Sequence, residues 1–254
     1  MHVSPLTIVL LALVSFVAGT VDAMAGGGGL LTVPSILAAG LPAHLALGTN
    51  KGSSTFGTSM ATYTFMRAGQ LPLRRAALGF ASGALGAVFG ARLQLAFSPA
   101  SLRPVVLGLL VAVAVVLAVP RKRPDRSVGA ARSTGALGPA LLAVILGAYD
   151  GFFGPGTGTF LVVGGVALFG LTMARATADA KAVNLGANFA ALVTFAIRGT
   201  VVWSVALPMA AGNFAGGALG AHLAMKGGDR AIRLAVIAVS LALVTKLALD
   251  LARG

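Results

Sequence analysis

Two glycine-rich loops interrupt apolar stretches of this chain, and each loop follows an isolated aspartate. Asp22 precedes the run Gly26–Gly29, and Asp150 precedes the loop Gly-Pro-Gly-Thr-Gly at 154–158. Such glycines free backbone N–H groups, and a helix that begins directly after the loop points its positive end at whatever occupies the gap. Two helix ends of this kind, facing each other, would form a binding site for an anion.

The second loop belongs to an internal copy of the first half of the chain. Asp150 lies 128 positions after Asp22, and Lys181 lies 130 positions after Lys51. Because the offset changes between the loop and the next apolar segment, we expect the second loop to be longer by two residues. Apolar segments broken at matching places in two copies are typical of secondary transporters. The offset stays at 130 for the pairs Phe65 and Phe195, Gly69 and Gly199, Gly86 and Gly216, and Gly90 and Gly220.

Lys51 and Lys181 begin long apolar segments and have asparagines nearby: Asn50 precedes Lys51, and Asn184 and Asn188 follow Lys181. A lysine in this position either extends to the membrane surface or completes an anion site. The loop glycines either contribute to that site or only allow close helix packing, and both alternatives stay open. The residues that we predict to bind substrate are Gly26, Gly27, Gly28, Gly29, Asn50, Lys51, Gly154, Gly156, Thr157, Gly158, Lys181 and Asn184.

Asp22 and Asp150 lie at the ends of apolar segments, where a carboxylate is costly unless it is paired or protonated. Each is a candidate for carrying a coupled proton. Each also has a simpler role, which we favour, in accepting hydrogen bonds from the free N–H groups of its loop. We predict no catalytic residue, metal or cofactor, because the chain has no Cys and no Glu, and its three histidines are scattered.

The composition indicates an integral membrane protein. Of the 254 residues, 57% are hydrophobic and 10% are charged, and the mean hydropathy is +0.94. With 35 glycines and few aromatic residues, the chain favours helices packed through small residues over a membrane barrel. The net charge is +13, and most of the Lys and Arg residues lie in short loops between apolar runs. This placement indicates the membrane topology and argues against nucleic acid as a partner.

The apolar segments predict an all-α fold of two inverted repeats with five helical elements each. They run over 5–23, 30–41, 46–66, 76–97 and 104–119, then 137–150, 158–172, 182–197, 202–224 and 232–250. The segments 30–41 and 158–172 are shorter than a span needs, so each is a half-helix, a tilted crossing or part of a re-entrant pair. We assign residues 1–119 to the first repeat, 120–136 to a cytoplasmic linker and 137–254 to the second repeat.

The basic residues set the orientation of these elements. If the short segments cross, the basic loops at 67–75, 120–135, 173–181 and 225–233 share one side, which the positive-inside rule makes the cytoplasm. If they turn back, the loop at 225–233 lies outside while the loop at 67–75 stays inside, an arrangement that the distribution of basic residues disfavours. The pairs Gly86 with Gly90 and Gly216 with Gly220 predict close helix packing, without a chemical role.

The strings around the first loop resemble those of the sulfite exporter TauE/SafE family of membrane permeases. They are Val-Asp-Ala-Met-Ala at 21–25 before the glycines and Gly-Leu-Pro-Ala-His-Leu-Ala-Leu-Gly-Thr-Asn-Lys at 40–51; Tyr-Asp-Gly-Phe-Phe-Gly-Pro-Gly-Thr-Gly at 149–158 agrees with them. The resemblance implies a secondary transporter of small anions such as sulfite or organosulfonates, placed in the cell membrane as a multi-pass protein and usually an exporter.

This reading makes a small anion and the lipid bilayer the partners, and it leaves a homo-oligomer open. We expect a proton gradient to drive transport as one half rocks about the other. A non-transporting membrane scaffold and a transporter of unrelated carboxylates are the alternatives.

Overall fold

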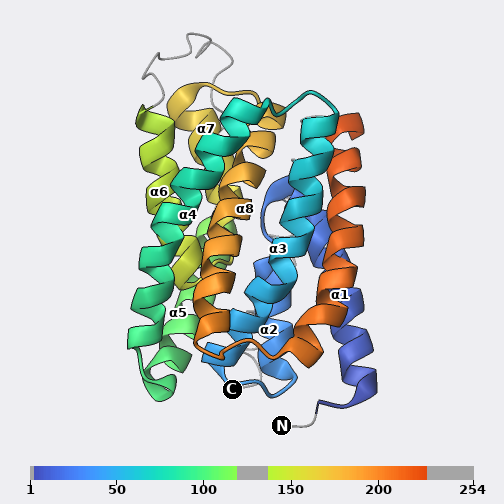
Figure 1. Cartoon of the computed structure of the whole chain (residues 1–254), viewed down its shortest axis with the longest axis vertical. Coiled ribbons are helices and arrows are strands. Elements are labelled where there is room, and N and C mark those ends of the chain that lie inside the picture. Colours follow the sequence, from blue (N-terminus) through green and yellow to red (C-terminus); the bar gives the residue numbers. More distant parts are fainter. Residues whose placement is uncertain (1–2, 119–136, 228–254) are drawn as a thin grey trace.

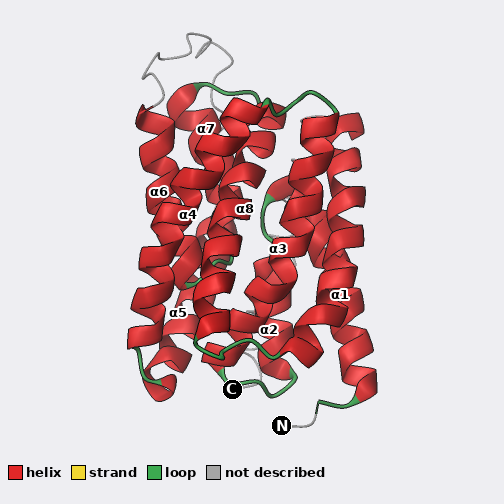
Figure 2. Ribbon diagram, in the orientation of Figure 1, coloured by secondary structure: helices red, strands yellow, loops and turns green. Residues whose placement is uncertain are grey.

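The computed structural model describes residues 3–118 and 137–227, and these residues form helices joined by short loops, with no strand among them (Figure 2). The helices are α1 (Pro5–Ala25), α2 (Gly29–Ala38), α3 (Ala43–Arg67), α4 (Leu73–Ala96), α5 (Pro99–Ala118), α6 (Leu137–Phe152), α7 (Thr157–Phe169), α8 (Met173–Ile197) and a further helix over residues 203–227. The predicted segment 232–250 and the linker at 120–136 lie outside the described residues.

Local signals explain where several helices begin and end. Ser4 caps α1 by accepting a hydrogen bond from the Thr7 N–H, and Pro5 occupies the first helical turn. Thr172 caps α8 in the same way. α1 ends at Gly26, whose φ of 71° is a left-handed conformation that favours glycine.

The duplication is visible in the helix bounds. α3 and α8 have 25 residues each and start 130 positions apart, as do α4 and the helix over 203–227. Glycines with positive φ recur at the same offsets, in the pairs Gly26 and Gly154, Gly40 and Gly170, and Gly69 and Gly199. The same turns therefore follow the same helices in both copies.

Two expectations about lengths are wrong. α2 and α7 begin 128 positions apart, so the extra residues belong to α7, which has 13 residues where α2 has 10, and not to the loop before it. α8 begins at Met173 and not near 182, because Asp179 and Lys181 pair with Arg75 and Asp22 of other helices and so can lie within a buried helix.

The short helices return toward the end of the bundle from which they came. α1 enters from the lower end in Figure 1 and α2 returns to that end, whereas α6 and α7 enter from and return to the upper end. At ~1.5 Å per residue the ten residues of α2 reach about 15 Å, half of a ~30 Å hydrocarbon core. Each pair is thus a re-entrant hairpin with its tip inside the bundle.

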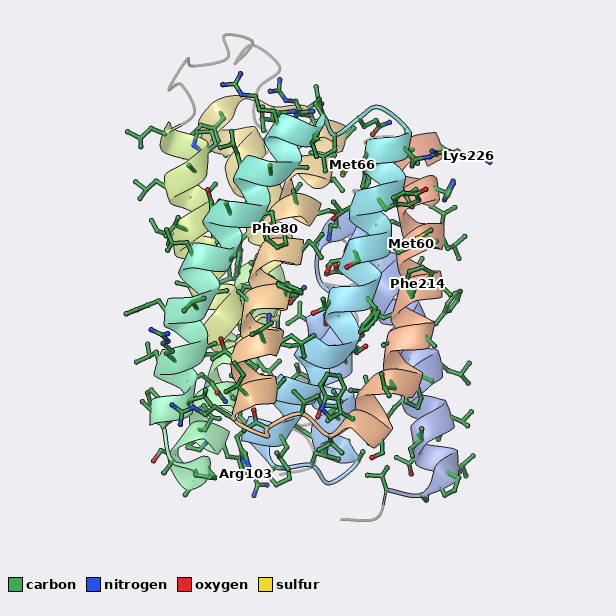
Figure 3. All side chains as sticks on the ribbon, in the orientation of Figure 1. Met60, Met66, Phe80, Arg103, Phe214 and Lys226 are labelled. Carbon is green, nitrogen blue, oxygen red and sulfur yellow. The ribbon has the colours of Figure 1, made fainter. Side chains whose placement is uncertain are left out.

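The expectation that a turn-back separates the basic loops is wrong. The short helices turn back, yet the described ends of three predicted basic loops lie together at the upper end: the α3–α4 connection, the start of α8 and the end of the helix over 203–227 (Figure 1). Figure 3 shows Lys226 at this end and Arg103 at the opposite one.

The helices pack in two groups that do not coincide with the two halves of the sequence. α4, from the first half, packs along α6 and α8 of the second. The helix over 203–227 packs instead on α1 and α3, so each copy contributes its fourth helix to the other. We name these sets the α8 group (α4, α6, α7 and α8) and the α3 group (α1, α2, α3 and residues 203–227), which stand side by side in Figure 1.

Glycines bring the exchanged helices into contact, as the sequence predicts. Gly86 and Gly90 of α4 lie directly against backbone carbonyls of α6. Gly216 and Gly220 lie in the same way against carbonyls of α1, at Phe16 and Thr20. A Cβ at any of these glycines would overlap the facing backbone, so the predicted close packing is confirmed.

The outer surface is apolar, as a lipid-facing surface must be. Leu85 and Phe89 of α4 are each 68% exposed, and Ile197 is 79% exposed. Figure 3 shows Phe214 on the outward face of its helix. Among the described residues α1, α4 and α8 are long and apolar enough to cross a membrane. The fold is therefore an all-helical membrane protein.

Candidate functional site

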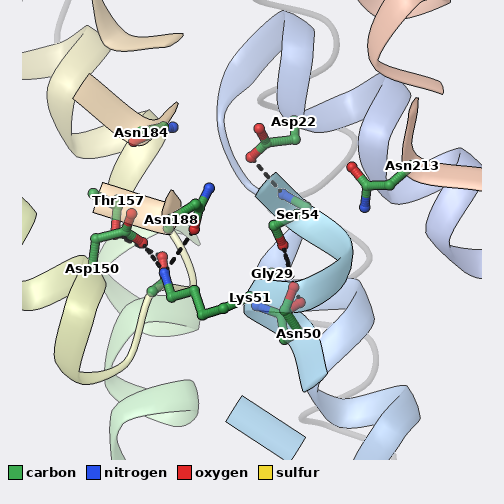
Figure 4. Close-up of a pocket in the computed structure, with 14 residues that line it drawn as sticks. Asp22, Gly29, Asn50, Lys51, Ser54, Asp150, Thr157, Asn184, Asn188 and Asn213 are labelled. Carbon is green, nitrogen blue, oxygen red and sulfur yellow. Dashed lines mark hydrogen bonds and ion pairs between the residues drawn. The ribbon is translucent and has the colours of Figure 1, made fainter. Parts of the chain in front are cut away.

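A small polar pocket lies where the two hairpin tips meet between the α3 and α8 groups (Figure 4). Its volume is about 30 Å³, which is room for two or three water molecules at ~10–15 Å³ each. The residues that line it are Asp22, Gly28, Gly29, Asn50, Lys51, Ser54, Asp150, Gly154, Gly156, Thr157, Gly158, Asn184, Asn188 and Asn213.

The hairpin tips are in direct contact. The Thr159 N–H donates to the carbonyl oxygen of Gly26 at 2.8 Å, and the Thr159 hydroxyl donates to the Ala25 carbonyl at 3.0 Å. A Cβ at Gly26 would overlap the backbone of Gly158. This contact brings the first turns of α2 and α7, with their positive helix ends, to the same pocket.

Lys51 provides the positive charge in the pocket wall. Its ammonium group donates to Asp150 Oδ1 at 2.9 Å and to Asn188 Oδ1 at 2.8 Å. The exposed fraction of the lysine side chain is 2% and that of Asp150 is 6%. Asp150 Oδ1 also accepts a hydrogen bond from the Thr157 hydroxyl at 3.2 Å, whereas Asp150 Oδ2 is buried without a partner among the described residues.

Lys181 forms the equivalent pair in the opposite sense. Its ammonium group donates to Asp22 Oδ2 at 2.9 Å and also to the Asp22 main-chain carbonyl. Asp22 Oδ1 accepts from the Gly28 N–H at 3.2 Å, so the predicted hydrogen bond to its own loop exists beside the ion pair. Lys181 is fully buried, and the expectation that these lysines extend to the membrane surface is therefore wrong for both.

Each ion pair joins the two halves of the sequence and the two helix groups. Lys51 of α3 reaches Asp150 of α6, and Lys181 of α8 reaches Asp22 of α1. The only other acid in the described part of the chain, Asp179, pairs with Arg75 at 2.8 Å. All three carboxylates there are thus neutralised by a basic partner, as burial in a membrane demands.

The uncharged lining consists of amides and hydroxyls. The chain has four asparagines, Asn50, Asn184, Asn188 and Asn213, and all four line the pocket. The Thr32 hydroxyl donates to Asn50 Oδ1 at 2.5 Å, and Asn184 Oδ1 is buried without a partner among the described residues. Amide groups both donate and accept, so this lining suits a ligand with several hydrogen-bonding atoms.

The structure brings most of the predicted site residues together. Gly26 and Gly27 do not line the pocket; Gly26 forms the contact between the tips instead. Lys181 also lies outside the lining. The prediction missed Ser54, Asn188 and Asn213, although an asparagine within an apolar helix is a signal that was present in the sequence for the last two.

Sequence comparisons identify the relatives of the chain. The sequence profile described as "Sulfite exporter TauE/SafE" matches residues 11–247. The chain belongs to this family. Its members are membrane transporters by description, and the resemblance seen in the glycine loops and the Asn50–Lys51 string is thereby confirmed.

Curated TauE/SafE relatives cover nearly the whole chain. "Probable membrane transporter protein ORF9" of Sinorhizobium sp is 37% identical over 93% of this chain and 90% of the relative. "Probable membrane transporter protein YfcA" of Escherichia coli K12 is 36% identical over 98% of this chain and 92% of its own length. A "Probable membrane transporter protein" of Haemophilus influenzae is 35% identical over 93% of this chain and 92% of the relative. No solved structure matches the chain.

Proposed function

We propose that this TauE/SafE protein is a secondary transporter of small anions, with sulfite and organosulfonates as the substrate class, and that the pocket is its substrate site. The pocket itself carries the proposal, because two half-helix N-termini and the buried Lys51 ammonium group meet there inside a membrane bundle. Positive helix ends, a lysine and amide donors together favour a bound anion. The family description, which names sulfite, supports the substrate class.

The Lys51–Asp150 pair suggests how a proton is coupled. The Lys51 ammonium group already donates a hydrogen bond to the Asp150 carboxylate, so a substrate anion must displace this carboxylate to reach the lysine. While Asp150 is ionised, its negative charge also repels the anion. Protonation of Asp150 removes the competition and the repulsion together. We therefore expect one proton to bind with each anion, with Asp150 as the carrier; Asp22, whose lysine lies outside the lining, is the weaker candidate.

This coupling has a consequence for the direction of transport. A proton that binds together with the anion crosses in the same direction, so the inward proton gradient favours uptake. The family description names export. Export by this route requires an outward gradient of the anion that is larger than the inward proton gradient. The inward proton gradient alone would not drive export by this route.

Alternating access would move the α3 group against the α8 group, and not the first half of the chain against the second. The two ion pairs and the hairpin tips all lie between these groups. α3 rises in Figure 1 whereas its counterpart α8 descends, which supports an inverted repeat.

Anion binding to the purified protein tests the proposal. We would measure thermal shifts with sulfite, sulfate, sulfoacetate, taurine and acetate for the wild type, for Lys51→Ala and for Lys226→Ala, a control at an exposed lysine outside the pocket. A stabilisation by sulfite or a sulfonate that Lys51→Ala abolishes and Lys226→Ala retains is expected. Stabilisation that survives in Lys51→Ala would exclude the pocket as the anion site.

A further inference from the structure

Asn213, from the helix over 203–227, forms a second polar cluster at the edge of the pocket. Its amide nitrogen donates to the hydroxyl oxygens of Ser15 at 3.0 Å and Ser53 at 3.3 Å, and the two hydroxyls are 2.8 Å apart. Both serines are fully buried, and Asn213 is 5% exposed. In the view of Figure 4, Asn213 lies across the pocket from Asp150.

The cluster exists in only one of the two helix groups, the α3 group. At the offsets of the repeat, the counterparts of Ser15 and Ser53 are Ala143 and Val183, which belong to an apolar core cluster. The counterpart of Asn213 is Gly83. The structure supports this equivalence, because Gly19 lies against Asn213 as its own counterpart Gly147 lies against Gly83. Three small or apolar residues of the α8 group thus correspond to three hydrogen-bonding residues of the α3 group.

The surrounding helices leave room for the asparagine side chain. A Cβ at Gly57 of α3 would overlap the amide group of Asn213, and a Cβ at Gly19 of α1 would lie 2.9 Å from its oxygen. The counterpart of Gly57 is Ala187, which faces the side without an asparagine. Glycine is therefore needed at both positions that face Asn213. Beside Gly83, the counterpart of Asn213, only one of the two corresponding positions is a glycine.

The two serines determine which atom of Asn213 is left for a ligand. They take up the donors of the amide nitrogen, whereas no hydrogen bond among the described residues involves Asn213 Oδ1. Figure 4 shows the Asn213 side chain at the edge of the pocket, where its oxygen lies beside the bare backbones of Gly19 and Gly57. The Asn213 carbonyl oxygen can only accept a hydrogen bond. It therefore favours a ligand that presents a donor, such as a hydroxyl group, over a ligand that presents a second anionic group.

We propose that Asn213 is a specificity-determining residue, held by Ser15 and Ser53, that accepts a hydrogen bond from a hydroxyl group on the substrate while the anionic head binds at the Lys51 side. The inference rests on the proposed function and narrows its substrate class to small anions that carry a hydrogen-bond donor. An anion with more than a few heavy atoms requires the pocket to widen beyond its present volume of about 30 Å³.

The test compares two ligands that differ by one oxygen atom, ethanesulfonate and 2-hydroxyethanesulfonate. Binding to the purified full-length protein is measured by calorimetry for the wild type, Asn213→Ala and the double variant Ser15→Ala/Ser53→Ala. Ser59→Ala is the matched control, since its hydroxyl bonds only to its own helix, at the Thr55 carbonyl. One neutral hydrogen bond predicts a roughly 3- to 10-fold preference of the wild type for the hydroxylated ligand.

Asn213→Ala is expected to bring this ratio close to one while the affinity for ethanesulfonate stays within about twofold, and the double serine variant is expected to reduce the ratio in part. A wild type without the preference, or an Asn213→Ala variant that retains it, overturns the inference. If Asn213→Ala does not fold, the double serine variant decides, because an unchanged ratio there also overturns it. If neither sulfonate binds and Lys51→Ala changes nothing, the proposed function itself fails.

Discussion

The two lysine–aspartate pairs are equivalent in the repeat, yet only one of the lysines faces the pocket. Lys51 lines the pocket and shares its ammonium group between Asp150 and Asn188. Lys181 does not line the pocket, and Asp22 holds it with both carboxylate and main-chain carbonyl. The same pair of residue types therefore faces the pocket in one repeat and is enclosed outside the pocket lining in the other.

The positions around the pairs explain this difference. The counterpart of Asn188, 130 positions earlier, is Thr58, whose hydroxyl donates to carbonyls of its own helix. The Asn188 amide nitrogen donates to the Thr58 hydroxyl at 3.5 Å, so the two equivalent residues contact each other. Of the two, only Asn188 accepts a hydrogen bond from a lysine, Lys51.

Removal of the charge at Lys51 is expected to have the largest effect on anion binding. Lys51→Met should weaken binding of sulfite or a sulfonate by about 100-fold, because a buried charge-assisted contact is lost. Equilibrium binding to the purified protein measures it. Since the variant also leaves Asp150 unpaired, Lys51→Met/Asp150→Asn serves as the control; recovery of affinity in the double variant would contradict a direct role for the lysine.

Lys181→Met should affect stability more than binding. Loss of one partner from a buried ion pair lowers the free energy of unfolding by about 3 kcal/mol. Because Lys181 lies outside the pocket lining, we expect the anion affinity to stay within about threefold of the wild type. Thermal unfolding in detergent and the same binding assay separate the two quantities. A loss of affinity as large as that of Lys51→Met would show that the pairs are functionally equal.

The carboxylates should differ in the pH dependence of anion binding. If a proton on Asp150 must accompany the anion, the affinity of the wild type falls about tenfold per pH unit once Asp150 is ionised. Asp150→Asn, which is always neutral, should flatten this dependence, whereas Asp22→Asn should retain it. Binding measured across several pH units decides. A flat profile in Asp22→Asn with a steep one in Asp150→Asn would reverse our assignment of the carrier.

Asn188→Thr, which copies the residue of the other repeat, should have a smaller effect on anion affinity than any change that removes the charge at Lys51. It removes one neutral hydrogen-bond partner of Lys51 but leaves the ion pair with Asp150. We expect a change in anion affinity of about two- to fivefold, measured as before. The reciprocal variant Thr58→Asn tests the other side, and an effect there as large as that of Lys51→Met would be inconsistent with the difference drawn between the pairs.

The sequence contains enough to predict the elements and much of the site. The offsets of 128 and 130 locate both glycine loops, both lysines and both aspartates. Apolar length shows that α2 and α7 are short for a span, but not whether they cross or turn back. Packing of the glycine pairs Gly86–Gly90 and Gly216–Gly220 also follows from spacing alone. These features depend on local patterns that duplication repeats.

The partners of the charged residues could not be predicted in the same way. Nothing in the spacing of Lys51 shows that it meets Asp150 rather than Asp22, because that choice depends on which helices are neighbours across the two groups. The exchange of the fourth helices is equally hidden, since glycine faces show that a helix packs closely but not on which helix. Asn213 enters the pocket only through this exchange.

The exchanged helices also have a consequence for how the chain is assembled. When the ribosome has completed α4, the carbonyls of α6 and α8 on which its glycines will lie have not yet been made. The first half of the chain therefore cannot finish its own packing during synthesis and must wait in the membrane for the second half. If the gene were divided between α5 and α6, each fragment would lack the surface that its fourth helix requires, and only production of both fragments together would give the assembled bundle.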